Sequence, residues 1–274
     1  MDDPTPPAST CDLLDADRLR AALPGQAAGG PVAVEVAWSL DSTNSELWRR
    51  PAPAGCQVLL AERQTAGRGR LGRAWVSPLS AQVCLSLRRR FDGGLARLEG
   101  LSLVAGVAVA EALHALGFGQ VGLKWPNDVV ADGAKLAGLL VECRGERTGA
   151  VQVVLGVGIN VRLPSGEAAS IDQAWTDLAR LAAPGQPPSR NEVAIAVLER
   201  LLQALDVFDR DGLAPFLARY RALDRLLGRQ IRIVAGRQAI AGRALGIAID
   251  GGLRVATCDG EQVFHGGEVS VRAP

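Results

Sequence analysis

The sequence predicts an α+β fold in which a larger part built of strands and helices is followed by a small β-barrel. Three observations carry this prediction. Apolar, strand-like runs alternate with helical segments along most of the chain, two leucine-rich helices follow one another before residue 226, and short strands separated by glycine turns begin near residue 228. With 274 residues, 48% of them hydrophobic and 22% charged, the chain can form one large domain and one small domain.

The first elements are a short helix, a strand and a second helix. Residues 15–23 predict the first helix, and a Gly/Pro-rich break over residues 24–31 separates it from a strand over residues 32–40. The sequence Asp-Ser-Thr-Asn at residues 41–44 opens a helix that extends to residue 49, because its hydroxyl and amide groups can cap free backbone donors. A strand over residues 58–61 then leads into a loop rich in arginine and glycine.

The middle of the chain continues the sheet. Alternating side chains predict a strand over residues 82–87, and the three arginines that follow, residues 88–90, are expected to form its solvated end. The apolar run over residues 95–116 predicts a buried helix. A strand ending at residues 124–128 and a strand over residues 135–142 are expected to form a hairpin through a tight turn at residues 132–133, before a further apolar strand over residues 151–161.

The last third predicts two helices and then short strands. Ser189 and Glu192 form a capping box for a helix whose apolar side chains extend from Leu198 to Phe208, and a second helix follows over residues 216–223. Turns at residues 235–236, 250–252 and 259–260 separate the short strands of a five-stranded barrel. We expect the domain boundary near residue 226.

Charge and cysteine content bound the class of protein. The formal net charge is +1, so the field that draws proteins onto nucleic acid or anionic lipid is missing, and neither is expected as a partner. The 5 cysteines are scattered and form no CxxC pair, which argues against a disulfide framework and against a structural zinc site. The N-terminus lacks the basic start and apolar core of a signal peptide. The most apolar stretch, residues 101–116, contains Glu111 and His114 and is too short to span a membrane comfortably. A cytoplasmic location is expected.

The most informative feature is the loop within residues 62–78. Residues 67–73 read Gly-Arg-Gly-Arg-Leu-Gly-Arg, directly after an apolar strand. Arginine offers paired donors that match phosphate and carboxylate oxygens, and glycine lets the backbone approach a ligand closely. The spacing is neither that of a Walker loop nor that of a dinucleotide fingerprint. The loop is therefore expected to hold an anion in another way.

Residue types alone indicate a cleft dominated by positive charge. Its candidates are Arg68, Arg70, Arg73, Lys124, Lys135, Asn127, Asp128, Ser42, Thr43 and Gln64. Such a set suits a substrate with several negative charges, for example a nucleoside triphosphate that reacts with a carboxylate. Neither His114 nor His265 lies near the loop in sequence, and a carboxylate nucleophile is already ionised at neutral pH, so the first step needs no strong base. Adenylate formation meets this condition.

Two of these signals have structural alternatives. The run at residues 124–126 also fits an ordinary strand end, and Gly156 and Gly158 also fit a β-bulge. As functional residues, the glycines would let a flat ligand lie against the strand. Taken together, the motifs favour function.

At these residues the chain resembles the biotin–protein ligases. The resemblance extends over residues 15–272 and is carried by the segments 42–44 (Ser-Thr-Asn), 62–70 (Glu-Arg-Gln-Thr-Ala-Gly-Arg-Gly-Arg), 124–128 (Lys-Trp-Pro-Asn-Asp), 135–138 (Lys-Leu-Ala-Gly), 156–160 (Gly-Val-Gly-Ile-Asn) and 266–270 (Gly-Gly-Glu-Val-Ser). It implies a mixed sheet backed by helices, as in class II aminoacyl-tRNA synthetases, followed by an SH3-like barrel. The implied division is an N-terminal segment over residues 1–30, a catalytic domain over residues 31–226 and the barrel over residues 227–274.

The resemblance also implies the reaction and the site. ATP and biotin would form biotinyl-adenylate, and a lysine of the biotin carboxyl carrier protein of acetyl-CoA carboxylase would then take up biotin. Biotin would contact Ser42, Thr43, Asn44, Gln64, Gly67, Arg68, Gly69, Arg70, Lys135 and Gly138; the adenylate would contact Arg70, Arg73, Trp75, Lys124, Asn127 and Asn160. Arg70, Lys124 and Lys135 would stabilise charge, and Asp128 would orient or deprotonate the incoming lysine, or orient the Mg²⁺ that accompanies ATP.

The chain departs from the pattern of the family at two points, and two alternative functions remain. No room is left ahead of residue 32 for the DNA-binding domain of the bifunctional members, so repressor activity is not expected. Leu71 replaces an arginine found in some relatives. The rivals are a lipoate–protein ligase and a non-catalytic sensor of biotin.

Overall fold

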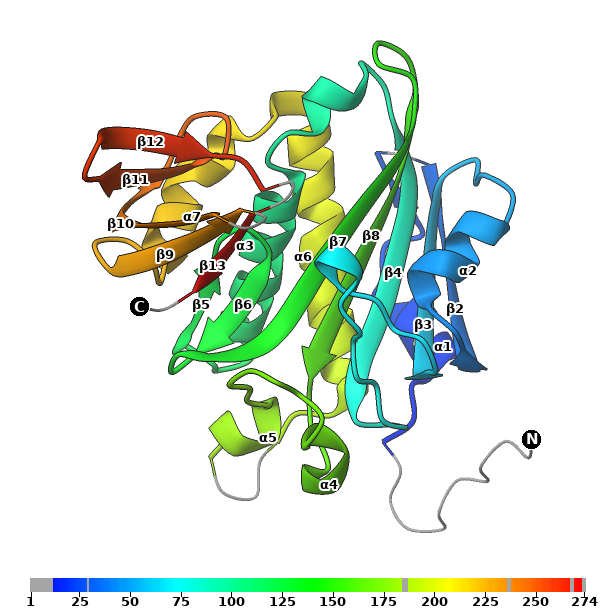
Figure 1. Cartoon of the computed structure of the whole chain (residues 1–274). Coiled ribbons are helices and arrows are strands. Elements are labelled where there is room, and N and C mark those ends of the chain that lie inside the picture. Colours follow the sequence, from blue (N-terminus) through cyan, green and yellow to red (C-terminus); the bar gives the residue numbers. More distant parts are fainter. Residues whose placement is uncertain (1–11, 29, 184–186, 236–237, 267–268, 273–274) are drawn as a thin grey trace.

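The computed structural model describes residues 12–28, 30–183, 187–235, 238–266 and 269–272, and it contains two sheets (Figure 1). The larger sheet has eight strands. In spatial order these are β1 (Gln26–Ala27), β2 (Gly30–Leu40), β3 (Cys56–Gln64), β4 (Gln82–Phe91), β8 (Val151–Asn160), β7 (Ala134–Gly145), β6 (Asp128–Ala131) and β5 (Val121–Lys124). Strands β2 and β3 are parallel and the other neighbours are antiparallel, so the sheet is mixed as expected.

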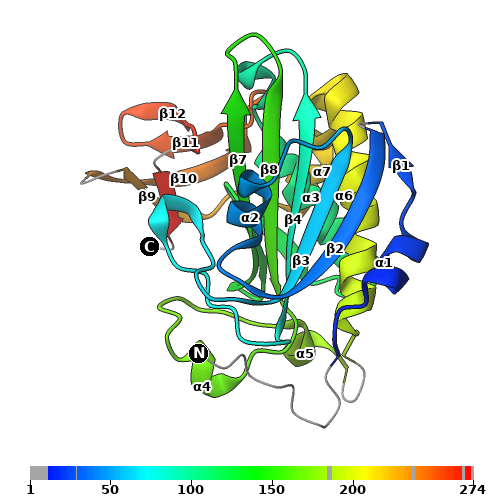
Figure 2. The same cartoon turned by 90° about the vertical axis from the view of Figure 1, so that its right-hand side faces the viewer.

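Helices cover both faces of this sheet. Helix α2 (Thr43–Arg49) lies on one face, whereas α3 (Leu101–Ala115) and α6 (Arg190–Asp211) lie on the other (Figure 2). The alternation along β3 explains this, because Leu59 packs with Leu47 of α2 and Leu60 belongs to the core beneath α3 and α6. The remaining helical elements are α1 (Ala16–Ala22), η1 (Arg70–Gly72), η2 (Leu95–Leu98), α4 (Ser165–Ala168), α5 (Leu178–Leu181), η3 (Ala214–Phe216) and α7 (Leu217–Leu223).

The predicted helix starts are confirmed. Asp15 caps α1, Ser42 caps α2 by accepting a hydrogen bond from the backbone of Ser45, and Ser189 forms the capping box of α6 with Glu192. These short polar side chains satisfy backbone donors that the first helical turn leaves open.

The apolar run over residues 95–116 is interrupted at its start. Gly100 adopts a left-handed conformation with φ of 80°, which separates η2 from α3. The stretch Leu95–Ala115 is long and apolar enough to cross a membrane, yet 67% of the most apolar window is buried inside the fold. It is the central core helix, as the sequence predicts.

The prediction that residues 88–90 form a solvated strand end is wrong for two of the three arginines. Arg88 is 6% exposed and Arg89 is 1% exposed, because β4 lies in the middle of a sheet covered on both faces. The guanidinium of Arg89 lies 2.7 Å from a carboxylate oxygen of Asp206 and 2.9 Å from one of Asp209, both on α6. The charge is thus neutralised by the covering helix.

The hairpin prediction is confirmed and extended. Asp132 and Gly133 adopt φ of 50° and 80° in the turn between β6 and β7, as a tight hairpin requires. Residues 128–131 form a separate strand, β6, that also pairs with β5. Residues 125–127 therefore form the turn between β5, which ends at Lys124, and β6, which begins at Asp128.

The C-terminal module is a five-stranded antiparallel sheet. Its strands are β12 (Gly260–Phe264), β11 (Leu253–Thr257), β10 (Gln238–Ile247), β9 (Gln230–Ala235) and β13 (Val269–Arg272). The predicted turns at residues 250–252 and 259–260 are present, whereas the turn at residues 235–236 lies partly outside the described residues. The indole nitrogen of Trp125 donates to the carbonyl of Gly251 at 3.0 Å, which joins this module to the larger sheet.

Candidate active site

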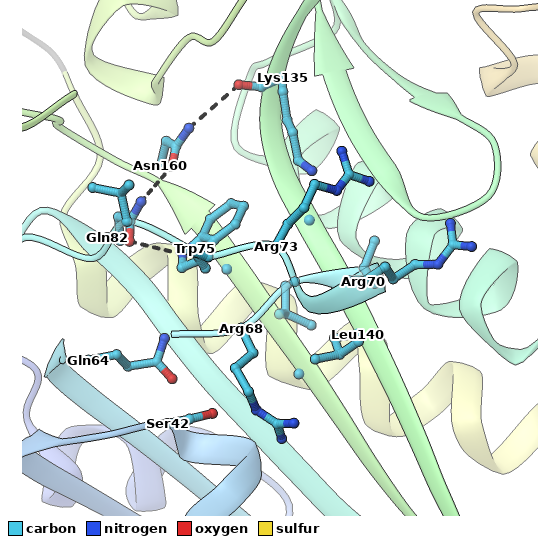
Figure 3. Close-up of a pocket in the computed structure, with 18 of the residues that line it drawn as sticks. Ser42, Gln64, Arg68, Arg70, Arg73, Trp75, Gln82, Lys135, Leu140 and Asn160 are labelled. Carbon is cyan, nitrogen blue, oxygen red and sulfur yellow. Dashed lines mark hydrogen bonds between the residues drawn. The ribbon is translucent and has the colours of Figure 1, made fainter. Parts of the chain in front are cut away.

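A cavity of about 270 Å³ lies on the α2 side of the larger sheet (Figure 3). Its floor is formed by β4, β7 and β8, the arginine loop (residues 67–75) covers it, and residues 170–175 close one end. Within the described chain, segments more than 100 residues apart in sequence therefore meet at one site.

Backbone hydrogen bonds shape the arginine loop. The backbone nitrogen of Gly69 donates to the carbonyl of Arg73 at 2.7 Å, and that of Trp75 donates to the carbonyl of Gly67 at 2.8 Å. A Cβ on Gly67 would lie 2.6 Å from the carbonyl oxygen of Trp75, so only glycine fits there. Leu71, at the tip, has φ of 56° and is 56% exposed. The loop is thus a small folded hairpin, not an extended strap.

A network of neutral and acidic side chains lines one end of the cavity. The backbone nitrogen and hydroxyl of Thr43 donate to Gln64 Oε1 at 2.8 Å and 3.1 Å. The hydroxyl of Ser86 lies 2.7 Å from Thr43 Oγ1 and 2.5 Å from Asn44 Oδ1. The amide of Asn44 donates to Glu142 at 2.8 Å. This end offers donors and acceptors held in fixed positions, as recognition of a neutral polar ring requires.

Glycines and an indole form the middle of the cavity. A Cβ added to Gly158 would lie 2.5 Å from Trp75 Cε2, and one on Gly138 would lie 3.1 Å from Trp75 Cζ3. A Cβ on Gly156 would lie 2.4 Å from Asn44 Oδ1. The missing side chains let these groups approach the strands, so the glycines are part of the site rather than a bulge.

Positive charge gathers at the other end. Lys135 Nζ lies 2.6 Å from Asp128 Oδ1 and 5.6 Å from the ring centre of Trp75. The guanidinium of Arg70 donates to Asn127 Oδ1 at 3.2 Å and to the carbonyl of Gly266 in the C-terminal module. Burial lowers the pKa of Arg70, with Asp128 acting to raise it and Arg73 acting to lower it. A bound anion would offset the cost of burying this charge.

A hydrogen-bonded chain holds Trp75 in place. The indole nitrogen of Trp75 donates to Gln82 Oε1 at 3.1 Å, and Gln82 Nε2 donates to Asn160 Oδ1 at 2.7 Å (Figure 3). Asn160 donates in turn to the carbonyl of Thr176 at 2.9 Å. The chain ties the arginine loop to β4, to β8 and to the segment that closes the cavity.

Most of the predicted site residues meet at this cavity. Its lining includes Ser42, Thr43, Asn44, Gln64, Arg68, Gly69, Arg70, Arg73, Trp75, Asn127, Lys135, Gly138 and Asn160. Lys124 and Asp128 instead line a cavity of about 10 Å³ that shares Asn127 with it, and Gly67 lies in the base of the loop. In the described chain, no group of three or more His, Cys, Asp or Glu side chains is arranged to hold a metal ion.

Several residues at the site were missed by the sequence analysis. They are Gln82, Ser86, Glu142 and the segment 170–175, which includes Trp175. Strand alternation could have found Ser86, because it is a polar residue between the apolar Leu85 and Leu87 of a central strand. The segment 170–175 carries no comparable local signal.

The fold and the cavity define an α+β protein with a cavity that has a hydrogen-bonding end and a cationic end. The sequence matches the Biotin/lipoate A/B protein ligase family over residues 36–160 and the Biotin protein ligase C terminal domain over residues 226–272. It is 37% identical to the biotin–[acetyl-CoA-carboxylase] ligase of Mycobacterium tuberculosis, over 92% of this chain and 99% of that protein. It is 39% identical to the bifunctional ligase/repressor BirA of Escherichia coli, over 91% of this chain and 76% of that protein.

Solved structures agree with these matches. The biotin protein ligase from Aquifex aeolicus in complex with biotin and ATP superposes with a TM-score of 0.74 at 30% identity, over 88% of this chain and 99% of that one. The chain belongs to the biotin protein ligase family and is a ligase, and the predicted fold class is confirmed.

Proposed function

We propose that this chain forms biotinyl-5′-AMP from biotin and ATP and transfers the biotinyl group to a lysine of the biotin carboxyl carrier protein of acetyl-CoA carboxylase. The observation that carries this proposal is the order of groups along the cavity: a hydrogen-bonding end, an apolar middle and a cationic end. Biotin has a polar ring, an alkyl chain and a carboxylate in the same order. The names of the relatives and the biotin and ATP in the Aquifex aeolicus complex support the same substrates.

Recognition of the ring is assigned to the polar end. Ser42, Thr43, Asn44 and Gln64 supply both donors and acceptors, with Gly67, Gly69 and Gly138 allowing close approach. A ring polar group left unpaired after burial would cost about 1–3 kcal/mol. Gln64 Oε1 already accepts two hydrogen bonds from Thr43, so its position at the cavity wall is fixed.

The first chemical step forms a bond between a carboxylate oxygen of biotin and the α-phosphorus of ATP, while the bond to pyrophosphate breaks. Both reactants are anions, so the step needs positive charge rather than a base. Arg70, Arg73, Lys124 and Lys135 are assigned this task, with Asn127, Asn160 and Trp75 on the nucleotide side. Mg²⁺ is expected to arrive with ATP, held mainly by its phosphates, since it is usually bound by one or two carboxylates and substrate phosphates.

In the second step the amine of the carrier lysine attacks the acyl carbon and AMP leaves. Asp128 is assigned to orienting that amine or accepting its proton. The contact of 2.6 Å between Asp128 and Lys135 supports this assignment, because it couples the carboxylate to the residue at the acyl-phosphate oxygen. The proton that the amine loses passes to Asp128 or to water, and AMP leaves as a phosphate anion.

The remaining expectations are proposals as well. A cytoplasmic location fits the unpaired thiols of Cys56, Cys84, Cys143 and Cys258. A domain boundary near residue 226 fits the two separate sheets of the described chain, whereas the boundary proposed near residue 30 does not, because β1 pairs within the larger sheet and Leu19 of α1 lies in its core. We propose no repressor activity for this chain; a gel-shift experiment with biotin-operator DNA tests this, and a specific shift would overturn it.

Substitution of Gly158 by alanine is expected to raise the dissociation constant of biotin about tenfold. The new methyl group would overlap the ring of Trp75, and such overpacking costs about 1–3 kcal/mol. Gly166→Ala is the matched control, because a Cβ there meets no atom within 4 Å. Isothermal titration with biotin measures both; equal affinity of the Gly158 variant and the wild type would contradict the assigned role of this strand.

The proposed function is tested by pyrophosphate release from ATP with biotin, with lipoate and with neither acid, before any carrier is added. Release with biotin alone is the expected result. Release with lipoate alone would indicate a lipoate–protein ligase, an activity that also occurs in this family. If neither biotin nor lipoate causes pyrophosphate release, the proposed first step is refuted.

A further inference from the structure

Arg68 and Glu142 form an ion pair that ties the arginine loop to the sheet. One terminal nitrogen of Arg68 lies 3.0 Å and 3.1 Å from the two carboxylate oxygens of Glu142. Glu142 belongs to β7, and the two residues are 74 positions apart in sequence. No motif in the sequence links them.

The same carboxylate also holds helix α2. Asn44 Nδ2 donates to Glu142 Oε2 at 2.8 Å, and Asn44 is 3% exposed at the polar end of the cavity. Glu142 therefore joins three segments: the arginine loop that covers the cavity, the helix that lines its polar end, and the strand that forms its floor. An interaction shared in this way fixes the position of the loop relative to the polar end.

The charge of Arg68 is already balanced. A ligand anion could bind Arg68 only by displacing Glu142 or by lying beside the carboxylate of Glu142. The first breaks the ion pair, and the second places two negative charges side by side, so both are unfavourable. Figure 3 shows Arg68 extending to the side of the cavity where Ser42 lies, whereas Arg70 and Arg73 extend the other way. The cationic end and the Arg68–Glu142 pair are thus separate parts of the site.

We propose that Glu142 is a positioning residue that holds the arginine loop closed over the cavity through Arg68, and that Arg68 serves loop closure rather than binding of the ligand's anion. The part of this proposal that concerns biotinyl-adenylate rests on the proposed function. A loop held closed would slow the escape of the adenylate and exclude the water that hydrolyses it.

Limited trypsin digestion without any ligand tests the pair alone. Glu142→Gln keeps an acceptor for Asn44 but removes the charge that holds Arg68, so cleavage at the loop arginines is expected to accelerate about two- to fivefold. The matched control is Glu261→Gln, which neutralises the exposed Arg254–Glu261 pair at 2.7 Å on the C-terminal sheet and should leave loop cleavage unchanged. Thermal unfolding of both variants should match the wild type. Wild-type cleavage of the loop in Glu142→Gln would overturn the proposal.

A double-mutant cycle on adenylate retention tests the coupling. Biotinyl-adenylate is formed on the enzyme, the complex is separated from free ligand, and the loss of bound adenylate is followed over time. Arg68→Gln, Glu142→Gln and the double variant are all expected to lose it about two- to fivefold faster, to a similar extent. If Arg68 instead bound the ligand's anion, Glu142→Gln would slow the loss and Arg68→Gln would accelerate it, which would overturn the proposal. Absence of adenylate on the wild type would refute the proposed function, while the digestion result would stand independently.

Discussion

Replacement of Lys135 by alanine is expected to lower the rate of biotinyl-adenylate formation by about 100- to 1,000-fold, the usual effect of removing one group that stabilises charge in a transition state. Lys135 lines the cavity, and its amino group lies 2.6 Å from Asp128 and over the ring of Trp75. The side chain is 15% exposed, so its charge acts in a partly water-excluded place. Single-turnover pyrophosphate release measures the effect.

Two further variants separate charge from packing. Lys135→Met keeps most of the hydrocarbon chain beside Trp75 and should lose as much activity as alanine, whereas Lys135→Arg keeps the charge and should retain more. Lys124 and Lys135 are the two lysines of this chain. An amine-specific acylating reagent therefore measures the accessibility of these two side chains, with the N-terminus as the one other amine that it labels. A methionine variant with wild-type turnover would contradict the assigned role.

Replacement of Glu62 by alanine is expected to lower the free energy of unfolding by about 3–5 kcal/mol, because it leaves Arg190 buried without its counter-charge. Glu62 and Arg190 are 3% and 2% exposed at the side chain, and their oxygen and nitrogen lie 2.5 Å apart. Glu62 also accepts from the backbone nitrogen of Leu14 at 2.6 Å. Arg190 donates to the carbonyl of Gln82 at 2.7 Å, so the pair supports the strand that carries this site residue.

Urea unfolding measures this loss. Glu261→Ala is the control, since its exposed pair with Arg254 should change stability by less than about 1 kcal/mol. A second variant, Glu62→Leu with Arg190→Met, removes both charges together and is expected to recover much of the loss. A Glu62→Ala protein as stable as the control would contradict the prediction, because it would mean that the charge of Arg190 is balanced without Glu62.

Local chemistry explains what the sequence could predict. Helix caps at Ser42 and Ser189 depend on neighbours a few residues away, and so does the turn at Asp132 and Gly133. The arginine loop was recognisable for the same reason, because its glycines and arginines are contiguous. These features are encoded in short windows, and the structure contains each of them.

Contacts between distant segments explain what could not be predicted. In the sequence, Glu142 is an ordinary charged residue of a strand, and its contacts with Arg68 and Asn44 form only when the sheet is assembled. Arg89 reads as a solvated strand end until α6 places two aspartates beside it. Gln82 gains its position between Trp75 and Asn160 only when β4 and β8 pair.

The central claim is tested most directly by the intact mass of a biotin carboxyl carrier protein incubated with this enzyme, ATP and biotin. The predicted result is a mass increase of one biotinyl group, absent without ATP and absent when the carrier's target lysine is replaced by arginine. An unchanged carrier mass, with the enzyme folded and ATP present, would contradict the claim. A lipoyl group added when lipoate replaces biotin, with no addition from biotin, would contradict it as well and would identify the rival ligase.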